Sequence, residues 1–364
     1  MTVHTVEGKT DLKSLSFQGL CEFVRELGGS DHNAGVIWRQ LYLADVTELG
    51  ALTGITRALR AALIQRATIH RLTPAFVLDS LDGTRKFVWS LPEGGQIESV
   101  LIPDSMPSRG RPRLTLCLSS QVGCAMACRF CLTGDLGLKR NLRPSEIVGQ
   151  VQQVREQLQP GQRITNLVFM GMGEPLHNLD NLIIALGTLF DDAAFNFSHR
   201  KVTVSTVGLV PQLRRLAALS PVSFAVSLNA TTEEQRRQIM PITRRYSLDE
   251  LMRACRELPL AHSKRITYEY VMMEGVNTSD DDLERLWRLM DGLPSKVNLI
   301  PYNENPDREI RRPSADRVRE WQHYLVTRGV QTSVRHTRGT DISAACGQLG
   351  KASLGEQIPE AALG

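Results

Sequence analysis

The chain has 364 residues, of which 42% are hydrophobic and 23% are charged, and its formal net charge is +4. This composition is ample for a hydrophobic core and typical of a globular protein of about two domains, or of one large barrel with an addition. We find no run of about 18 apolar residues and no signal-peptide core before Leu15, which predicts no membrane span and a cytoplasmic location. Seven cysteines, an odd number, do not fit a secreted disulfide framework.

The small positive charge permits a nucleic-acid partner without requiring one. Basic residues recur in short groups rather than in one block. The groups lie at 139–143, 200–201, 244–245, 311–312 and 335–338. Each group alone is compatible with a solvated surface. Because several are close to predicted strand ends, a face that contacts phosphates is an equally good interpretation.

The N-terminal part, residues 1 to about 75, is predicted to be a small helical domain. Apolar residues recur at helical spacing over 12–27, 36–43 and 55–69, and Gly28-Gly29 ends the first of these helices.

Residues 76–103 change to a two-residue alternation that predicts a short antiparallel β meander. The alternation covers 75–78, 85–90 and 96–102, with glycine-containing turns between these runs. The proline- and serine-rich stretch that follows, up to Pro112, is predicted to be a loop.

From residue 114 onward, short apolar strands alternate with capped helical patterns. The predicted strands are 114–118, 167–170, 202–205, 223–228, 266–272 and 296–300. The predicted helices are 144–158, 179–190, 209–219, 247–257, 279–290 and 314–328. Six strand–helix units predict an α/β fold, in which right-handed crossovers curl a parallel sheet into a partial barrel. Functional residues are then expected at the carboxyl ends of the strands.

The first predicted strand is followed by three cysteines, Cys124, Cys128 and Cys131, at C-x3-C-x2-C spacing. One compact loop with this spacing can bring the three sulfurs to a single point. Thiolates are soft ligands that suit iron–sulfur clusters or zinc, but a closed zinc site needs a fourth ligand, and none follows closely. Three thiolates on a cubane cluster would leave one iron open for a substrate. A zinc site with a distant fourth ligand, or three unrelated buried cysteines, are the alternatives.

Polar or glycine-rich residues also follow four of the other five predicted strands, at 171–175, 205–206, 227–229 and 301–303. Each alone is an ordinary turn, but as a set beside the cysteines they predict a site at the mouth of the barrel. The glycines of the first group would let a ligand lie against the backbone, and Glu174 would accept hydrogen bonds from an ammonium group.

The cysteine spacing, with an aromatic residue before the last cysteine, resembles the radical S-adenosylmethionine (SAM) superfamily. More specifically, the segments 119–124, 171–175, 266–270 and 344–349 closely resemble the RlmN/Cfr family of radical SAM methyltransferases, most of all its RlmN members, which act on an adenosine of 23S rRNA. The resemblance runs from about residue 80 to 350. It implies a partial (β/α)6 radical SAM barrel with a small helical N-terminal domain and a short β meander.

The resemblance also implies cofactors and their ligands. A [4Fe-4S] cluster would be held by Cys124, Cys128 and Cys131. SAM would be contacted by Gly173, Glu174, Ser205, Ser227, Leu228, Asn229 and Asn303. Many relatives have histidine where this chain has Asn229.

Catalytic roles follow from the same resemblance. One SAM would methylate Cys346, and a radical made from a second SAM would remove hydrogen from that methyl group. The carbon radical would add to adenine, and Cys117 would release the product through a transient disulfide with Cys346. Glu98 would be the proton acceptor. Cys21 and Cys255 are expected to be structural.

The implied product is 2-methyladenosine in 23S rRNA and in tRNA next to the anticodon. C8 methylation of the same rRNA adenosine is the first alternative, and a non-catalytic, metal-containing RNA-binding protein is the second. The expected partners are 23S rRNA, tRNA and an electron donor such as flavodoxin, and the expected state is a monomer.

The expected organisation is an RNA-binding helical domain at 1–75, the meander at 76–103, the barrel with its catalytic cysteine segment at 104–350, and a flexible tail at 351–364.

Overall fold

The computed structural model describes residues 5–6, 8–104, 113–260, 265–305 and 308–350. Its main sheet has ten strands in the order β15-β14-β13-β12-β11-β10-β7-β6-β5-β4. Neighbouring strands from β15 to β7 run parallel, and those from β7 to β4 run antiparallel. The expected tail, and most of the loop predicted before residue 112, lie outside the described residues.

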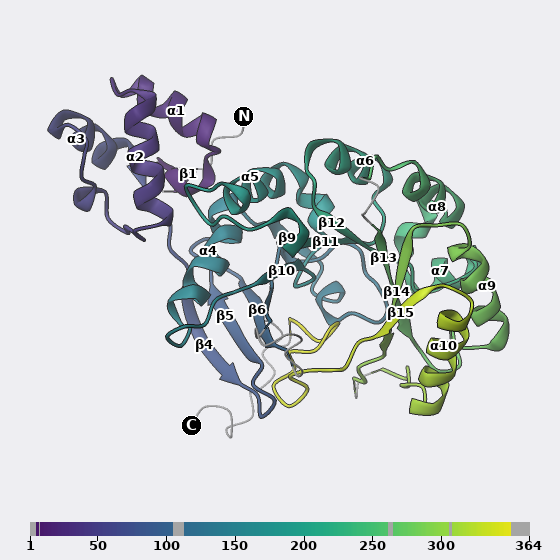
Figure 1. Ribbon diagram of the computed structural model, residues 1–364. Coiled ribbons are helices and arrows are strands. Elements are labelled where there is room, and N and C mark those ends of the chain that lie inside the picture. Colours follow the sequence, from purple (N-terminus) through teal and green to yellow (C-terminus); the bar gives the residue numbers. More distant parts are fainter. Residues whose placement is uncertain (1–4, 7, 105–112, 261–264, 306–307, 351–364) are drawn as a thin grey trace.

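The parallel part of the sheet curls with its helices on the outer side (Figure 1). Its strands are β7 (Leu114–Cys117), β10 (Asn166–Phe169), β11 (Val202–Thr206), β12 (Ser223–Ser227), β13 (Ile266–Met272), β14 (Ser295–Pro301) and β15 (Gln331–Val334). The helices are α4 (Pro144–Glu156), α5 (Leu179–Phe190), α6 (Val210–Leu219), α7 (Glu233–Ile239), α8 (Leu248–Glu257), α9 (Asp280–Met290) and α10 (Ala315–Thr327). The six predicted strand–helix units are confirmed, with ends shifted by one or two residues. The sequence did not predict β15 or α7.

Hydroxyl side chains set the starts of several of these helices. Ser247, Ser279 and Ser314 each accept a hydrogen bond from a backbone N–H in the first turn of α8, α9 and α10. At α9 the bond is reciprocal, because Asp282 accepts one from the backbone of Ser279. Such caps satisfy N–H groups that have no partner within the helix, which is why these helices begin where they do.

The predicted meander consists of β4 (Thr73–Asp79), β5 (Arg85–Ser90) and β6 (Gln96–Pro103). It is not a separate sheet. β6 pairs antiparallel with β7, so the meander continues the main sheet beyond the first parallel strand. The carboxyl end of β7 is therefore flanked by the parallel strand β10 on one side and by the meander on the other.

The N-terminal part holds the three predicted helices, α1 (Phe17–Glu26), α2 (Asp31–Tyr42) and α3 (Arg57–Arg66). A small sheet that the sequence did not predict joins them. Its strands are β1 (Thr5–Val6), β2 (Lys9–Asp11) and β3 (Ala67–Thr68). Short 3-10 helices occur at Leu12–Ser14, Leu49–Ala51, Leu132–Gly134, Pro175–Asn178, His199–Lys201 and Pro241–Arg244.

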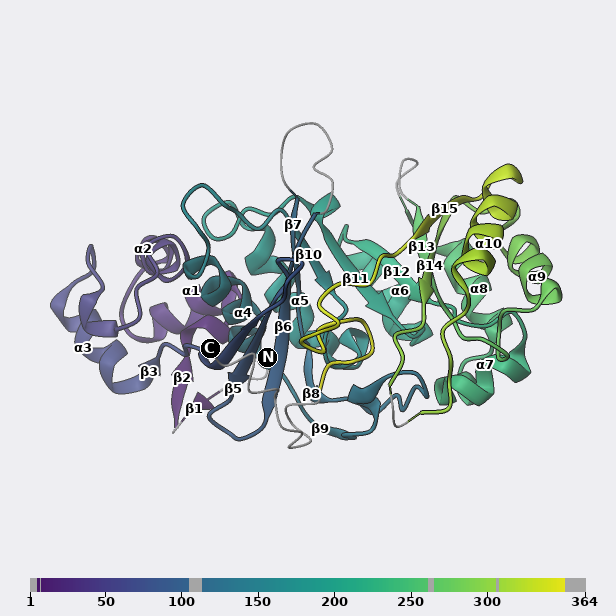
Figure 2. The ribbon, with the colours of Figure 1, turned by 90° about the horizontal axis from the view of Figure 1, so that it is seen from below.

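The N-terminal helices lie at one end of the molecule, beside α4, in both ribbon views (Figures 1 and 2). Buried polar contacts connect the two parts. Lys13 Nζ donates to Gln152 Oε1 at 2.7 Å, and the hydroxyls of Ser14 and Ser145 are 2.9 Å apart. Burial lowers the pKa of Lys13 to about 8, against the opposing charges of Asp11 and other neighbours. In the part of the chain that the structure describes, no helix has the length and apolar character of a membrane span.

Candidate active site

The three clustered cysteines lie on a loop between the antiparallel strands β8 (Gln121–Gly123) and β9 (Leu138–Asn141). The hairpin fixes both ends of this loop, since the Cys124 N–H donates to the Gly137 carbonyl at 3.0 Å. All three cysteines line one pocket of about 160 Å³, together with residues from the carboxyl ends of the parallel strands. We call it the cysteine pocket.

The donor set of this pocket fits an iron–sulfur cluster. Burial raises the pKa of the Cys124 thiol to about 12 and that of Cys128 well above its usual value, and the neighbouring sulfurs raise both further. Burial also raises the pKa of Cys131. Three thiolates could therefore face one another only around a positively charged group. In a cubane cluster each cysteine ligates a separate iron atom, so the three sulfurs are spaced around the cluster rather than bound to one metal ion.

That the three sulfurs meet at one point stays a prediction, although all three cysteines line the same pocket. Among the described residues, no three His, Cys, Asp or Glu side chains are arranged to hold a single metal ion.

The glycine-rich loop after β10 has a packing reason for its glycines, and a ligand contact there stays a prediction. A Cβ added at Gly171 would lie 2.7 Å from the backbone of Leu118, and one added at Gly173 would lie 2.5 Å from the Gln121 side chain. Gly173 also has a φ of +101°, which favours glycine. The glycines thus allow two protein loops to approach each other, although both still line the cysteine pocket.

Glu174 is a buried carboxylate in the lining of the cysteine pocket. It accepts hydrogen bonds from the Thr206 hydroxyl at 2.7 Å, the Val207 N–H at 2.9 Å and the Leu176 N–H at 3.1 Å. Burial raises its pKa to about 7 despite these three donors. A carboxylate has about four acceptor positions, so one remains for a ligand such as an ammonium group.

The ends of β11 and β12 contribute Ser205 and Ser227 to the pocket lining. Leu228 does not line it. Its side chain is completely buried, and its carbonyl accepts a hydrogen bond from Arg236. A contact between Leu228 and a ligand in this pocket is therefore not visible in the structure.

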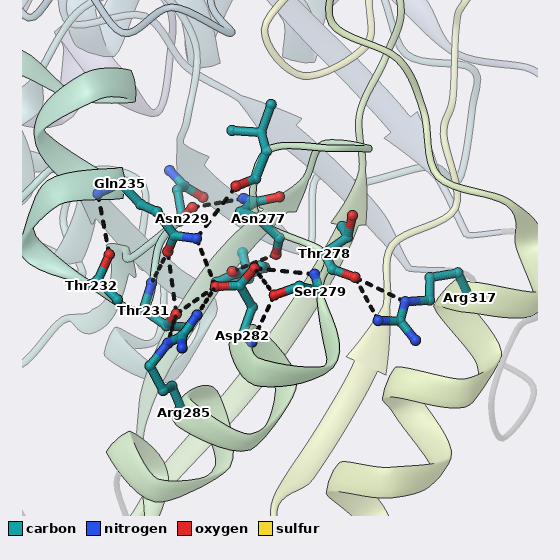
Figure 3. Close-up of polar contacts among 12 residues, drawn as sticks. Asn229, Thr231, Thr232, Gln235, Asn277, Thr278, Ser279, Asp282, Arg285 and Arg317 are labelled. Carbon is teal, nitrogen blue, oxygen red and sulfur yellow. Dashed lines mark hydrogen bonds and ion pairs between the residues drawn. The ribbon is translucent and has the colours of Figure 1, made fainter.

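Asn229 lines the pocket, but its side chain is already engaged with protein atoms. Its Oδ1 accepts from the Val271 N–H at 2.8 Å, and its backbone has a φ of +58°, which asparagine tolerates better than most residues. Asn277 donates to the Asn229 carbonyl, at the edge of a polar network centred on Asp282 (Figure 3). Asn229 therefore shapes the turn after β12.

Asn303 holds the segment that contains Cys346. Its Nδ2 donates to the Cys346 carbonyl at 3.0 Å, and its Oδ1 accepts from the Thr337 hydroxyl at 2.8 Å. We call residues 335–350 the C-terminal segment. It crosses the open side of the barrel (yellow in Figure 2) and contacts the cysteine loop, where the Leu132 N–H donates to the Gly347 carbonyl at 2.8 Å.

A second pocket, of about 560 Å³, lies inside the curled sheet. We call it the inner pocket. Its lining comes from inward-facing residues of the parallel strands and from the C-terminal segment. Cys346 lines both pockets, whereas Cys117 lines only the inner one. Burial and the nearby Cys346 raise the pKa of Cys117 to about 12.

Glu98 lines neither pocket. Its side chain is completely buried, its Oε1 accepts from the Gly350 N–H at 3.0 Å, and its Oε2 lies 3.5 Å from the ammonium group of Lys86. Glu98 therefore shares neither of these two pocket linings with the other predicted site residues. It lies beneath the end of the C-terminal segment.

Two pocket residues were missed as site residues by sequence reasoning. Glu269 and Arg335 line both pockets. Glu269 belongs to one of the segments that carried the family resemblance, and Arg335 begins one of the short basic groups. These were the available signals, but neither indicated that the two side chains face the same space.

Comparisons with known proteins agree with this geometry. Residues 118–287 match the radical SAM superfamily. The dual-specificity RNA methyltransferase RlmN of Syntrophotalea carbinolica is 48% identical over 341 residues, which cover 94% of this chain and 90% of the relative. The RlmN of Pelobacter propionicus is 48% identical over 354 residues, covering 97% and 99%.

A solved structure has the same fold over nearly the whole chain. The crystal structure of a radical SAM methyltransferase from Sphaerobacter thermophilus superposes with a TM-score of 0.84 at 40% identity. The match covers 93% of this chain and 98% of the other.

Proposed function

The chain belongs to the RlmN family of dual-specificity RNA methyltransferases, and on this premise we propose that it methylates C2 of a specific adenosine in 23S rRNA and of the adenosine next to the anticodon in tRNA. The family uses a [4Fe-4S] cluster and SAM. The cluster would be held by Cys124, Cys128 and Cys131, which line the cysteine pocket.

The observation that carries the proposal is the position of Cys346. Its half-buried side chain lines both pockets, and the cysteine pocket also contains the three cluster cysteines. A sulfur at this junction can accept a methyl group on one side and present it to a base on the other. Cys117, on the inner side, is suited to the later attack on that sulfur.

When bound, the cluster supplies an electron and SAM supplies both the methyl group and the radical that activates it. The chain's own residues orient and protect these steps. Asn303 fixes the backbone of Cys346, and Glu174 retains one acceptor position for an ammonium group. The high pKa of Cys117 keeps it a thiol until it is needed.

Glu98 remains the proposed proton acceptor, and its environment adds a condition. Because its carboxylate accepts from Gly350 and faces Lys86, it reaches a substrate only after the end of the C-terminal segment moves. Glu98→Gln is expected to leave Cys346 methylation intact and to stop product release, measured as a protein–RNA adduct on a denaturing gel. Equal product yields from Glu98→Gln and the parent would refute the role.

The rim of the inner pocket is suited to RNA. It includes the exposed side chains of Arg113, Lys296 and His336 and the half-buried Arg338. Cationic side chains around a cavity would contact the phosphates on either side of an extruded adenosine. An electron donor such as flavodoxin, a monomeric state and a cytoplasmic location complete the proposal.

The deciding experiment is anaerobic reconstitution of the cluster, exposure to SAM, digestion, and mass spectrometry of the peptide containing Cys346. A methyl group on Cys346 is expected, and it is expected to persist in the control variant Cys21→Ala. An unmodified Cys346 in a protein that still cleaves SAM would overturn the proposed methyl route.

Nucleoside analysis of the RNA product then decides the position of the methyl group. We expect 2-methyladenosine from both 23S rRNA and tRNA substrates. A product of 8-methyladenosine would assign the alternative C8 activity. RNA binding without any methylated product, in a protein whose Cys346 is dispensable, would assign the non-catalytic alternative.

A further inference from the structure

Lys86 is a buried lysine of β5 that the proposed mechanism does not yet use. Its side chain is 4% exposed, and its ammonium nitrogen lies 3.5 Å from Glu98 Oε2. The strand register explains this proximity. Glu98 is paired with Val88, two residues along β5 from Lys86, so the lysine and the glutamate occupy diagonal positions on one face of β5 and β6. A long side chain can span such a diagonal. Two paired strands of the main sheet therefore hold the ion pair together.

The C-terminal segment contacts both members of this pair. Lys86 Nζ donates to the Ser343 carbonyl at 3.3 Å, and the Gly350 N–H donates to Glu98 Oε1 at 3.0 Å. The two contacts lie on either side of Cys346 in the chain. The ion pair belongs to the sheet, whereas the groups that cover it belong to a segment without regular secondary structure.

Lys86 supplies a positive charge to Glu98 at a position that water does not reach. The Glu98 side chain is completely buried, and within residues 5–6, 8–104, 113–260, 265–305 and 308–350 its Oε2 accepts no hydrogen bond. A buried carboxylate without a nearby cation is costly and takes up a proton instead. An ammonium group at ion-pair distance favours the charged form. If the end of the C-terminal segment moves away, Glu98 loses Gly350 but keeps Lys86, because both residues belong to paired strands.

We propose that Lys86 is a positioning residue that keeps Glu98 ionised, and so able to accept a proton, after the C-terminal segment has moved. This inference rests on the proposed function and deepens it. In the step that it serves, one proton passes from the protein–RNA adduct to a Glu98 oxygen, and the electron pair of the broken bond stays on the adduct. Glu98 becomes a neutral acid, Lys86 keeps its charge, and nothing is oxidised or reduced.

The simpler interpretation is that Lys86 only balances a buried charge and thereby stabilises the fold. Both interpretations predict a loss of stability in Lys86→Met, so stability alone does not separate them. They differ in which step of the reaction fails. A structural role predicts that Cys346 methylation and adduct resolution fall together. A role through Glu98 predicts that adduct resolution slows while Cys346 methylation continues.

The first measurement is infrared spectroscopy of the reconstituted holoenzyme at pH 7, without SAM or RNA. A protonated carboxyl group has a C=O stretching band that an ionised carboxylate lacks. This band is expected in the difference between Lys86→Met and Lys86→Met/Glu98→Gln, because only the first variant has a carboxyl group at position 98. It should be missing from the difference between the parent and Glu98→Gln. A folded Lys86→Met protein without the band would overturn the inference.

The second measurement follows the two steps separately in folded protein. Lys86→Met is expected to methylate Cys346 within about threefold of the parent rate but to resolve the adduct about 10- to 100-fold more slowly, because general-base catalysis contributes about 10²–10⁴-fold. Lys86→Met/Glu98→Gln should resolve the adduct no more slowly than Glu98→Gln, since both changes act on the same group. The matched control is Lys13→Met, which removes another buried ammonium group that lines neither pocket and should match the parent in both steps.

Two further variants keep the test decisive. Lys86→Arg retains the charge and is expected to resolve the adduct faster than Lys86→Met. If Lys86→Met does not fold, Lys86→Gln replaces it, because glutamine keeps a hydrogen-bond donor for the Ser343 carbonyl. Adduct resolution at the parent rate, or equal losses in both steps, contradicts the inference. A parent protein that never forms an adduct would refute the proposed function, whereas the infrared spectra test the charge of Glu98 independently.

Discussion

The cysteine pocket is built from two kinds of wall. The loops at the ends of β7 to β14 are anchored by continuous strand pairing and by buried residues such as Gln121 and Gln150. The C-terminal segment opposite them has no regular secondary structure over residues 335–350. It is attached by separate contacts, including the bonds from Asn303 to the Cys346 carbonyl and from Gly350 to Glu98.

The difference suggests a functional division between the two walls. The regular wall is suited to a group that stays bound, because many cooperative contacts hold its geometry. The irregular wall carries the residue that is proposed to change chemically, and a few separable contacts allow it to shift between steps. The following experiments test this division, from the largest expected effect to the smallest.

Removing one cysteine from each wall is expected to have the largest effect. Cys128→Ala and Cys346→Ala should both abolish RNA methylation. Only Cys128→Ala should also lose the bound iron and the cluster absorbance, because Cys128 is on the proposed cluster loop and Cys346 is not. Iron content and visible spectra after reconstitution provide the measurement. Loss of iron in Cys346→Ala would contradict the division.

A glycine substitution in each wall tests how rigid the two walls are. Gly173→Ala would bring a Cβ 2.5 Å from Gln121, and Gly347→Ala would bring one 2.9 Å from the Phe130 carbonyl. We expect Gly173→Ala to lower the free energy of unfolding by about 2–5 kcal/mol, from strain and overpacking together. Gly347→Ala should lower it by about 1–2 kcal/mol, because the segment can move, but should slow Cys346 methylation more strongly.

Gly161→Ala is the matched control for both glycine variants. Its φ is +84°, and nothing lies within 4 Å of an added Cβ. Urea unfolding of the three variants therefore separates backbone strain from steric overlap. Equal losses for Gly161→Ala and Gly173→Ala would show that the close approach of the two loops contributes nothing.

Lys13 lines neither pocket, so changing it tests stability without altering the pocket linings. Its folded pKa of about 8 is below the usual 10.5. Between these values the unfolded chain binds the extra proton, so stability rises with pH by up to about 3 kcal/mol. Lys13→Met should lack this rise between pH 8 and 10.5, while Cys346 methylation remains unchanged. Melting temperatures measured across this pH range test the prediction. If the melting temperature changes with pH in the same way in the parent and in Lys13→Met, the prediction is wrong.

The smallest effect is expected from the contact between the C-terminal segment and the turn before β5. Asp341 accepts hydrogen bonds from the Ser80 hydroxyl at 2.6 Å and the Leu81 N–H at 3.2 Å. These bonds lower the pKa of Asp341 against the opposing effect of burial. Asp341→Ala should slow Cys346 methylation about threefold with less than about 1 kcal/mol of lost stability, since the contact is largely exposed. An unchanged methylation rate would show that this contact does not position Cys346.

The sequence predicted the regular wall well, because its signals are local. Apolar runs such as 266–272 and capped helices such as 279–290 matched the structure to within a residue. β15 was missed because Gln331–Val334 is short and its residues are only exposed or half-buried, so no apolar run marks it.

The irregular wall was harder to predict, because its geometry depends on contacts between residues far apart in the chain. Glu98 was expected beside the substrate, but it is covered by Gly350, 252 positions away. Asn303 lines the cysteine pocket, and its contact with SAM stays a prediction, but the sequence did not indicate that its amide also holds the C-terminal segment. The glycines at 171 and 173 line the cysteine pocket, but the sequence did not indicate that the 118–121 stretch also requires them.

The contact between Thr133 and Leu349 has a consequence for the order of assembly. The Thr133 hydroxyl donates to the Leu349 carbonyl across 216 positions of the chain. The ribosome therefore completes the cysteine loop long before it makes the segment that covers it. During that interval the loop lacks the contacts that the C-terminal segment makes with it.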